Sequence, residues 1–177
     1  MSKKLIIIIA IIAVVAIAAV VLGIVFTKDK PAENNKGALV EENKGTSEGN
    51  VEGTLEEIME KVYEGISEEN LPMALSNMEV NAENVEGFLG TANVTYAEAL
   101  ASESMVGSIA HSVVLVRLND VESADATVQT IKDNVNPRKW ICIEASNVVV
   151  KSKGNLVILI MSNEELAPKL EANFENL

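Results

Sequence analysis

An uninterrupted apolar stretch near the N-terminus constrains this 177-residue chain more than any other feature. It runs from Leu5 to Phe26 and contains no charged or strongly hydrogen-bonding side chain. As a helix it would be about 33 Å long, which matches the ~30 Å hydrocarbon core of a bilayer. A helix also satisfies its own backbone hydrogen bonds, as lipid requires. The stretch therefore predicts a transmembrane segment.

The residues around this stretch favour an uncleaved anchor over a removable signal peptide. Lys3 and Lys4 form a short basic start, which is typical of both. The small residues of Ala16-Ile17-Ala18 would offer a cleavage site, and cleavage stays open as the alternative. The apolar run nevertheless continues to Phe26, which is longer than a signal peptide needs.

The basic residues that flank the helix do not decide its orientation in the membrane, because Lys28 and Lys30 after it balance the two lysines before it. The orientation is therefore inferred from the length of the chain that follows. A long C-terminal part translocates largely regardless of charge, and a lysine-led first helix acts as an export signal. We therefore expect a single-pass protein of the cell membrane. The expected parts are a cytoplasmic tail at 1–4, a signal anchor at 5–26, a flexible polar linker at 27–53 and an extracytoplasmic domain at 54–177.

Charge divides the chain in the same place. The net charge is −12 for the whole chain, and residues 1–30 carry +3, which leaves −15 for residues 31–177. Such an acidic surface repels phosphate backbones, so nucleic-acid binding is disfavoured. Residues 28–53 are rich in Gly, Asn, Glu and Lys and have too few apolar side chains to fold, which is typical of a tether.

Four helices are predicted in the C-terminal part, one of them a short helix that begins at Asn81 and ends at Gly90. Thr54 and Glu57 form a capping box, followed by an apolar stripe at Leu55, Ile58, Met59 and Val62. A second stripe steps by three and four residues through Val121, Ala124, Val128, Ile131 and Val135. Ser162 and Glu165 make a further capping box before the last helix, which Pro168 should start late or kink.

Four strands are predicted at 94–103, 111–118, 147–152 and 155–161, whereas 71–80 is ambiguous between loop and a short strand. The second and fourth strands are apolar without alternation, a pattern of strands buried on both sides. They should therefore be central and antiparallel neighbours. We expect an α+β fold, a two-layer sandwich with a mostly antiparallel four-stranded sheet of order 1-2-4-3 and helices packed on one face.

Two stretches carry a family resemblance. ALASESMVGSIAHSVVLVRL and NPRKWICIEASNVVVKSKGNLVILIM, within about Asn81 to Met161, resemble anchored extracytoplasmic domains of Gram-positive bacteria. No activity is established for that family. The resemblance implies an α+β domain in the bacterial cell envelope and implies no cofactor or catalytic residue.

Catalytic and metal-binding patterns are weak. His111 and Cys142 are the only residues of their types, so a thiol–imidazole dyad would have to use both. Cys142 lies between two isoleucines, where a buried and inert thiol is expected. One His and one Cys do not make a usual zinc site, and the carboxylates are scattered. We expect no catalytic residue, metal or cofactor.

One loop suggests a contact surface instead. The segment after the first predicted strand is unusually apolar for a loop, and Trp140 is the only tryptophan. Folding of the loop back onto the core is one interpretation, and an exposed patch for protein contact is the other. The residues of this possible interaction patch are Met105, Val106, Ile109, His111 and Trp140.

The sequence thus predicts a membrane-anchored, non-catalytic module that binds a protein or another envelope component. A small envelope hydrolase or transferase with an unrecognised carboxylate site is one alternative, and a small-ligand sensor is another. A cleft with convergent carboxylates would favour the enzyme, and a flat apolar patch would favour binding. The oligomeric state is left open.

Overall fold

The computed structural model describes residues 49–177. The predicted cytoplasmic tail at 1–4, the anchor from Leu5 to Phe26 and most of the predicted linker lie outside the described residues. Within 49–177, no helix combines the length and apolar character needed to cross a bilayer. The helices are α2 (Leu55–Val62), η1 (Glu68–Asn70, a 3₁₀ turn), α3 (Val85–Leu89), α4 (Ala124–Asn134) and α5 (Ala167–Glu175). The strands are β1 (Leu75–Glu79), β2 (Glu98–Ser104), β3 (Ser112–Arg117), β4 (Asn147–Lys153) and β5 (Leu156–Ser162).

The strands form a five-stranded antiparallel sheet in the order β1-β2-β3-β5-β4. The two most apolar strands, β3 and β5, are neighbours within it, with Val114 opposite Leu159. Every residue of β5 is buried, and so is every residue of β3 except Arg117. Because successive side chains point to opposite faces of a strand, a continuous buried run requires that both faces be covered.

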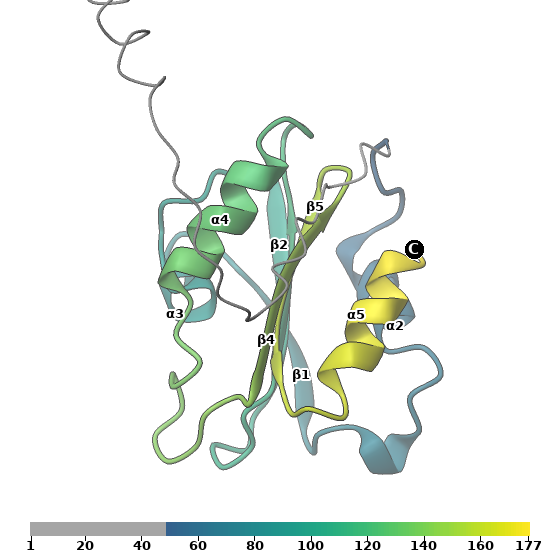
Figure 1. Ribbon diagram of the computed structural model, residues 1–177, viewed down its shortest axis with the longest axis vertical. Coiled ribbons are helices and arrows are strands. Elements are labelled where there is room, and N and C mark those ends of the chain that lie inside the picture. The colour runs from purple at the N-terminus through teal and green to yellow at the C-terminus, as the bar shows by residue number, and fades with distance from the viewer. Residues whose placement is uncertain (1–48) are drawn as a thin grey trace, which may run out of the picture. The chain divides into compact units, whose positions relative to one another are not determined.

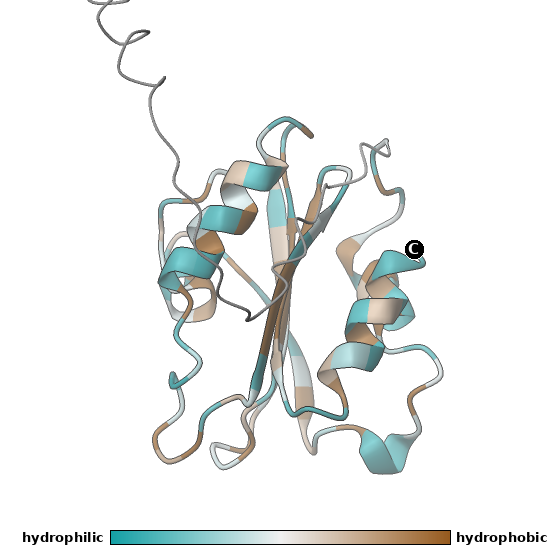
Figure 2. Ribbon diagram, viewed as in Figure 1, coloured by the Kyte–Doolittle hydropathy of each residue, from teal (hydrophilic) through white to brown (hydrophobic). Residues whose placement is uncertain are grey.

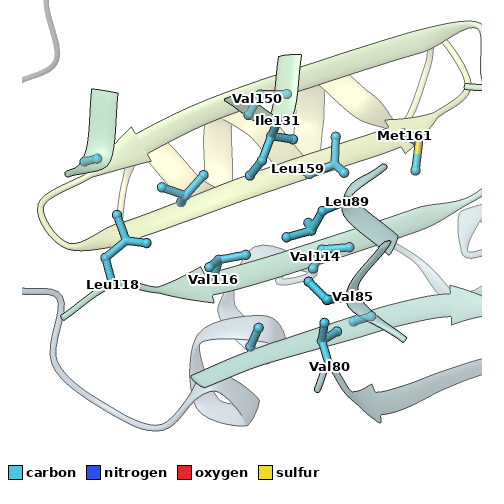
Figure 3. Packing of buried hydrophobic residues seen from close by; sticks show 14 of the residues in the cluster. Val80, Val85, Leu89, Val114, Val116, Leu118, Ile131, Val150, Leu159 and Met161 are labelled. Carbon is cyan, nitrogen blue, oxygen red and sulfur yellow. The ribbon is translucent and has the colours of Figure 1, made fainter. Parts of the chain in front are cut away.

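Helices cover both faces of the sheet, so the domain has three layers (Figure 1). On one face α3 and α4 pack against the first core cluster, part of which is drawn in Figure 3. On the other face α2 and α5 pack against a second cluster. The first cluster includes Leu89, Val114, Ile131 and Leu159, and the second includes Ile58, Leu115, Ile158 and Phe174.

The predicted two-layer, four-stranded sandwich with helices on one face is therefore wrong. The structure adds β1 as an edge strand and divides the helices between the faces. The physical reason is that β3 and β5 are apolar along most of their length. The helices on both sides of the sheet carry polar residues as well as apolar ones (Figure 2). Two separate apolar faces need two helix layers to exclude water.

Local signals decide how the two helices of the second face begin. The Thr54 hydroxyl accepts a hydrogen bond from the Glu57 N–H, and the Glu57 carboxylate accepts one from the Thr54 N–H, which confirms the first capping box. The predicted capping box of Ser162 and Glu165 is wrong. Ser162 is the last residue of β5, and the Asn163 side chain instead accepts the Glu165 and Leu166 N–H groups. The helix then starts late, at Ala167.

Gly90 allows α3 and the end of α4 to approach closely on the first face. It caps α3 with a φ of 78°, in the left-handed region that glycine tolerates. A Cβ atom at this position would lie 2.1 Å from the Asn134 carbonyl oxygen. The backbones of the two segments can therefore touch only because residue 90 has no side chain.

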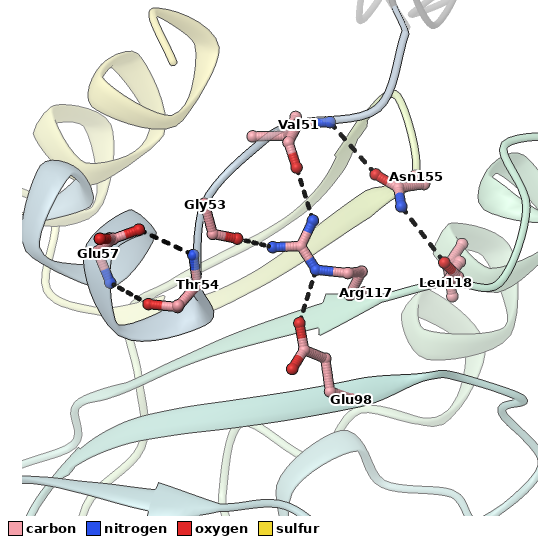
Figure 4. A network of polar contacts seen from close by, with 8 residues as sticks. All are labelled: Val51, Gly53, Thr54, Glu57, Glu98, Arg117, Leu118 and Asn155. Atoms are coloured by element: carbon pink, nitrogen blue, oxygen red, sulfur yellow. Dashed lines mark hydrogen bonds and ion pairs between the residues drawn. The ribbon is translucent and has the colours of Figure 1, made fainter.

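Arg117 fastens the start of the described chain to one end of the sheet (Figure 4). Its guanidinium donates to the carbonyl oxygens of Val51 and Gly53, each at 2.6 Å, and pairs with Glu98 at 2.7 Å. The Val51 N–H donates in turn to the Asn155 side chain. The predicted linker extended to residue 53, although Val51 could join the domain; Val51 and Gly53 are both bonded to residues at this end of the sheet. We call this end of the sheet, where β3 ends and β5 begins, the attachment end.

Candidate functional site

The opposite end of the sheet gathers three loops, at 71–74, 105–111 and 135–146 (Figure 1). The first two are joined by a hydrogen bond from the Met105 N–H to the Ala74 carbonyl oxygen at 3.0 Å. The third is joined to the β2–β3 hairpin by an ion pair of 2.6 Å between Lys139 and Glu103. These contacts make one continuous surface, which we call the loop end.

Large apolar side chains are exposed at the loop end. The exposed fraction is 67% for Met73, 64% for Met105 and 97% for Ile141, and Ile143 is exposed as well. Single exposed apolar residues are normal on a soluble domain. Four of them in three adjoining loops are more typical of a contact surface, because each remains in water at a cost that a partner would remove.

The residues of the predicted patch fall in different environments. Met105 is exposed, whereas Val106 and Ile109 are half-buried. The Ile109 N–H donates a hydrogen bond of 2.9 Å to the Val106 carbonyl oxygen, so the loop partly folds back. His111 is only 1% exposed and belongs to the interior. Trp140 is half-buried against the first core cluster. The structure thus brings Met105 to the surface and takes His111 away from it.

Cys142 is exposed, so the prediction of a buried thiol is wrong. The flanking isoleucines are exposed too, because this segment pairs with no strand. A hydrogen bond of 2.9 Å from the Ala145 N–H to the Pro137 carbonyl oxygen closes the loop, and residues 141–144 between them are exposed. The local pattern Ile-Cys-Ile indicated a core position, but an apolar pattern does not tell a core strand from an exposed loop.

Lys139 holds the projecting loop against the sheet. Its ammonium contacts the Glu103 carboxylate, lies 3.4 Å from the Ser112 hydroxyl oxygen and stands over the Phe88 ring at 4.7 Å and the Trp140 ring at 5.2 Å. Burial lowers the pKa of Lys139, and the Glu103 carboxylate opposes that decrease. The loop end is therefore a supported surface rather than a set of free loops.

We expect Glu103→Gln to lower the free energy of unfolding by about 1.5–3 kcal/mol, because it leaves a largely buried ammonium without its charged partner. Glu144→Gln is the matched control, since it breaks the pair between Glu144 and the exposed Arg138 and should lower stability far less. Urea unfolding followed by Trp140 fluorescence measures both. Equal losses for the two variants would contradict a supporting role of Lys139.

Directly behind the loop end, His111 joins three elements. Its Nε2 atom lies 2.7 Å from the Tyr63 hydroxyl oxygen at the end of α2, and its Nδ1 atom lies 2.9 Å from the Ser162 hydroxyl oxygen at the end of β5. A neutral imidazole accepts one hydrogen bond and donates the other, so both hydroxyls are satisfied. His111 is the last residue of the loop at 105–111, Tyr63 comes just after α2 and Ser162 is the last residue of β5.

The environment keeps this network neutral. Burial lowers the pKa of His111 to about 4. Burial also raises the pKa of Tyr63 above its usual range, and a hydrogen bond with Ser102 opposes the increase. Both shifts arise because an interior with few charges stabilises neither an imidazolium nor a phenolate.

A serine hydrogen-bonded to a histidine, which is hydrogen-bonded in turn to a tyrosine, resembles a catalytic arrangement in which the histidine activates the serine as a nucleophile. Ser162, however, is 1% exposed, so its hydroxyl cannot meet a substrate without unfolding of the strand end. The network is better explained as a buried polar clamp between α2, β3 and β5. Sequence reasoning missed it because Tyr63 and Ser162 are 48 and 51 residues away from His111 along the chain.

Besides a depression of about 350 Å³ lined by residues 55–56, 79–81 and 96–100, the described residues form two larger surface depressions. One, of about 550 Å³, lies along α2 and is lined by Glu57, Glu60, Lys61 and Glu64. The other, of about 470 Å³, lies at the loop end and is lined by Arg138, Trp140, Ile141, Cys142, Ile143 and Glu144. Within residues 49–177, no group of three or more His, Cys, Asp or Glu side chains could hold a metal ion.

Comparisons of the chain with protein-family models, with curated proteins and with solved structures give no match. Its function is therefore inferred from the geometry of its own residues.

Proposed function

We propose that the domain is a non-catalytic module that binds a protein through its loop end. The observation that supports this function is the exposure of Met73, Met105, Ile141 and Ile143 on adjoining loops that ion pairs and hydrogen bonds hold in place. Burial of such side chains by a partner provides about 25 cal/mol per Å² of apolar surface. A prepared apolar surface also loses less conformational entropy on binding than free loops would.

The position of the attachment end fits a tethered binding module. Val51 and Gly53 reach the sheet where β3 ends, whereas the apolar loops lie where β3 begins. We propose that the preceding residues anchor the chain in the cell membrane through Leu5–Phe26, with the domain outside the cytoplasm. A tether joined to the attachment end would leave the loop end free to meet an envelope protein.

Capture of partners from intact cells tests the proposal. The full chain is compared with Met105→Asp and Ile141→Asp, each of which places a carboxylate in the apolar surface without touching either core cluster. Ala97→Asp is the matched control, because it adds the same charge at an exposed position beside the attachment end. Circular dichroism first establishes that all variants are folded.

We expect one partner to be recovered with the wild type and with Ala97→Asp, and to be reduced at least about tenfold with both loop-end variants. Recovery of the same partner at equal levels with all four proteins would place its binding surface elsewhere. Recovery of no partner with the folded wild type would contradict the proposed function.

A further inference from the structure

Exposed carboxylates also lie at the loop end, in the segments that follow α2 and precede α5. Glu68 and Glu69 lie in η1, just before the loop at 71–74, and Glu164 and Glu165 lie in the connection from β5 to α5. Figure 1 shows both segments at the same end of the sheet as the three loops. None of the four carboxylates takes part in an ion pair with another residue of 49–177.

The cations of the apolar loops cannot offset these carboxylates. Arg138 is paired with Glu144, and Lys139 is paired with Glu103. Among the described residues, the nearby cations without an ion pair are Lys61 and Lys132, in the last turns of α2 and α4, and Lys169 in the first turn of α5. The loop end therefore has an apolar centre whose charged neighbours are paired, and an acidic side formed by the four carboxylates without an ion pair.

We infer that the partner at the loop end is a protein whose contact surface joins apolar side chains to flanking Lys or Arg residues. This inference rests on the proposed function and adds the chemistry of the partner. Complementary charge steers association and excludes wrong partners, while the apolar contacts supply most of the affinity. An anionic membrane and a second copy of this chain both present negative charge to the same carboxylates and so fit less well.

Selection from a random peptide display library tests this chemistry, because it requires no candidate partner. The bait is the full chain in nanodiscs of zwitterionic lipid. Two double variants are compared with the wild type. Met105→Asp combined with Ile141→Asp places charges in the apolar centre, and Glu164→Lys combined with Glu165→Lys reverses the charge of two residues on the acidic side. Glu122→Lys with Asp125→Lys is the matched control, because it changes the net charge equally at the beginning of α4, beside the attachment end.

We expect the wild type to enrich peptides that carry apolar residues together with Lys or Arg. The affinity of the best peptide should fall about tenfold for the Glu164 and Glu165 pair of changes and stay unchanged for the Glu122 and Asp125 pair. Raising the salt concentration should weaken binding to the wild type and to the control alike.

The other outcomes separate the two proposals. If the enriched peptides are apolar and bind the Glu164 and Glu165 double variant as tightly as the wild type, the inferred chemistry of the partner is wrong and the loop end remains a protein-binding surface. If the peptides bind the Met105 and Ile141 double variant as tightly as the wild type, both the inferred chemistry and the proposed function are wrong. Both proposals also fail if the loop end binds phosphatidylglycerol vesicles, or pairs with a second copy in sedimentation, in place of peptides.

Discussion

Phe174→Ala is expected to lower the free energy of unfolding by about 3–5 kcal/mol. Phe174 is the largest fully buried side chain of the domain and lies in α5, on the second face of the sheet. Its removal leaves a cavity between α5 and the strands, and a helix of nine residues has little stability without such packing. Urea unfolding monitored by circular dichroism measures the loss.

The matching change on the first face is Ile131→Ala in α4, for which we expect a loss of about 2–5 kcal/mol. Lys169→Ala serves as the surface control in α5 and should change stability by less than about 0.5 kcal/mol. A large loss for Ile131→Ala together with a small loss for Phe174→Ala would mean that only one face is covered, as in the two-layer sandwich.

Acidification is expected to remove about 3 kcal/mol of stability through His111 alone. The pKa of this imidazole is about 4 in the fold, against 6.5 when it is exposed to water. Because the folded pKa is the lower one, the unfolded chain binds the proton first as the pH falls. The contribution is complete above pH 6.5 and is lost progressively between pH 6.5 and pH 4.

His111→Gln isolates this effect from the titration of the many carboxylates. Glutamine can still hydrogen-bond the hydroxyls of Tyr63 and Ser162 but takes up no proton. Urea midpoints at several pH values should therefore fall more steeply for the wild type than for the variant below pH 6.5. Parallel curves for the two proteins would show that His111 is not held neutral by burial.

Hydrophobic patterning predicted the centre of the sheet but not its layers. The uninterrupted apolar runs of β3 and β5 indicated strands buried on both sides, and this burial is confirmed. Burial on both sides already required helices on both faces, which the expected one-sided packing did not provide. The apolar stripes of α2 and α4 show that each helix is amphipathic, but a stripe does not state which face of the sheet it covers.

β1 shows a second limit of local patterning. Its sequence, Leu-Ser-Asn-Met-Glu, has no alternation of apolar and polar residues. The strand exists because it pairs with β2, with Leu75 opposite Ser104, and its edge position tolerates polar side chains. Pairing of this kind is a long-range property that five residues cannot indicate.

The candidate site was only partly predictable for the same reason. The apolar loop around Met105 stood out in the sequence, whereas Met73 and Ile141 join it only because the sheet brings three loops together. The residues around Ser162 fit the pattern of a helix cap, but β5 continues through Ser162 and its hydroxyl is hydrogen-bonded to His111. A polar clamp built from distant residues has no short motif.

Site-specific photo-crosslinking in intact cells tests the loop end as a protein-binding surface most directly. A photoreactive residue replaces Ile141 in the full chain, and in a second protein it replaces Ala97 beside the attachment end. We predict a discrete adduct with one envelope protein from position 141 and none from position 97. Adducts from position 97 alone, or from neither position in a folded protein, would contradict the proposed role of the loop end.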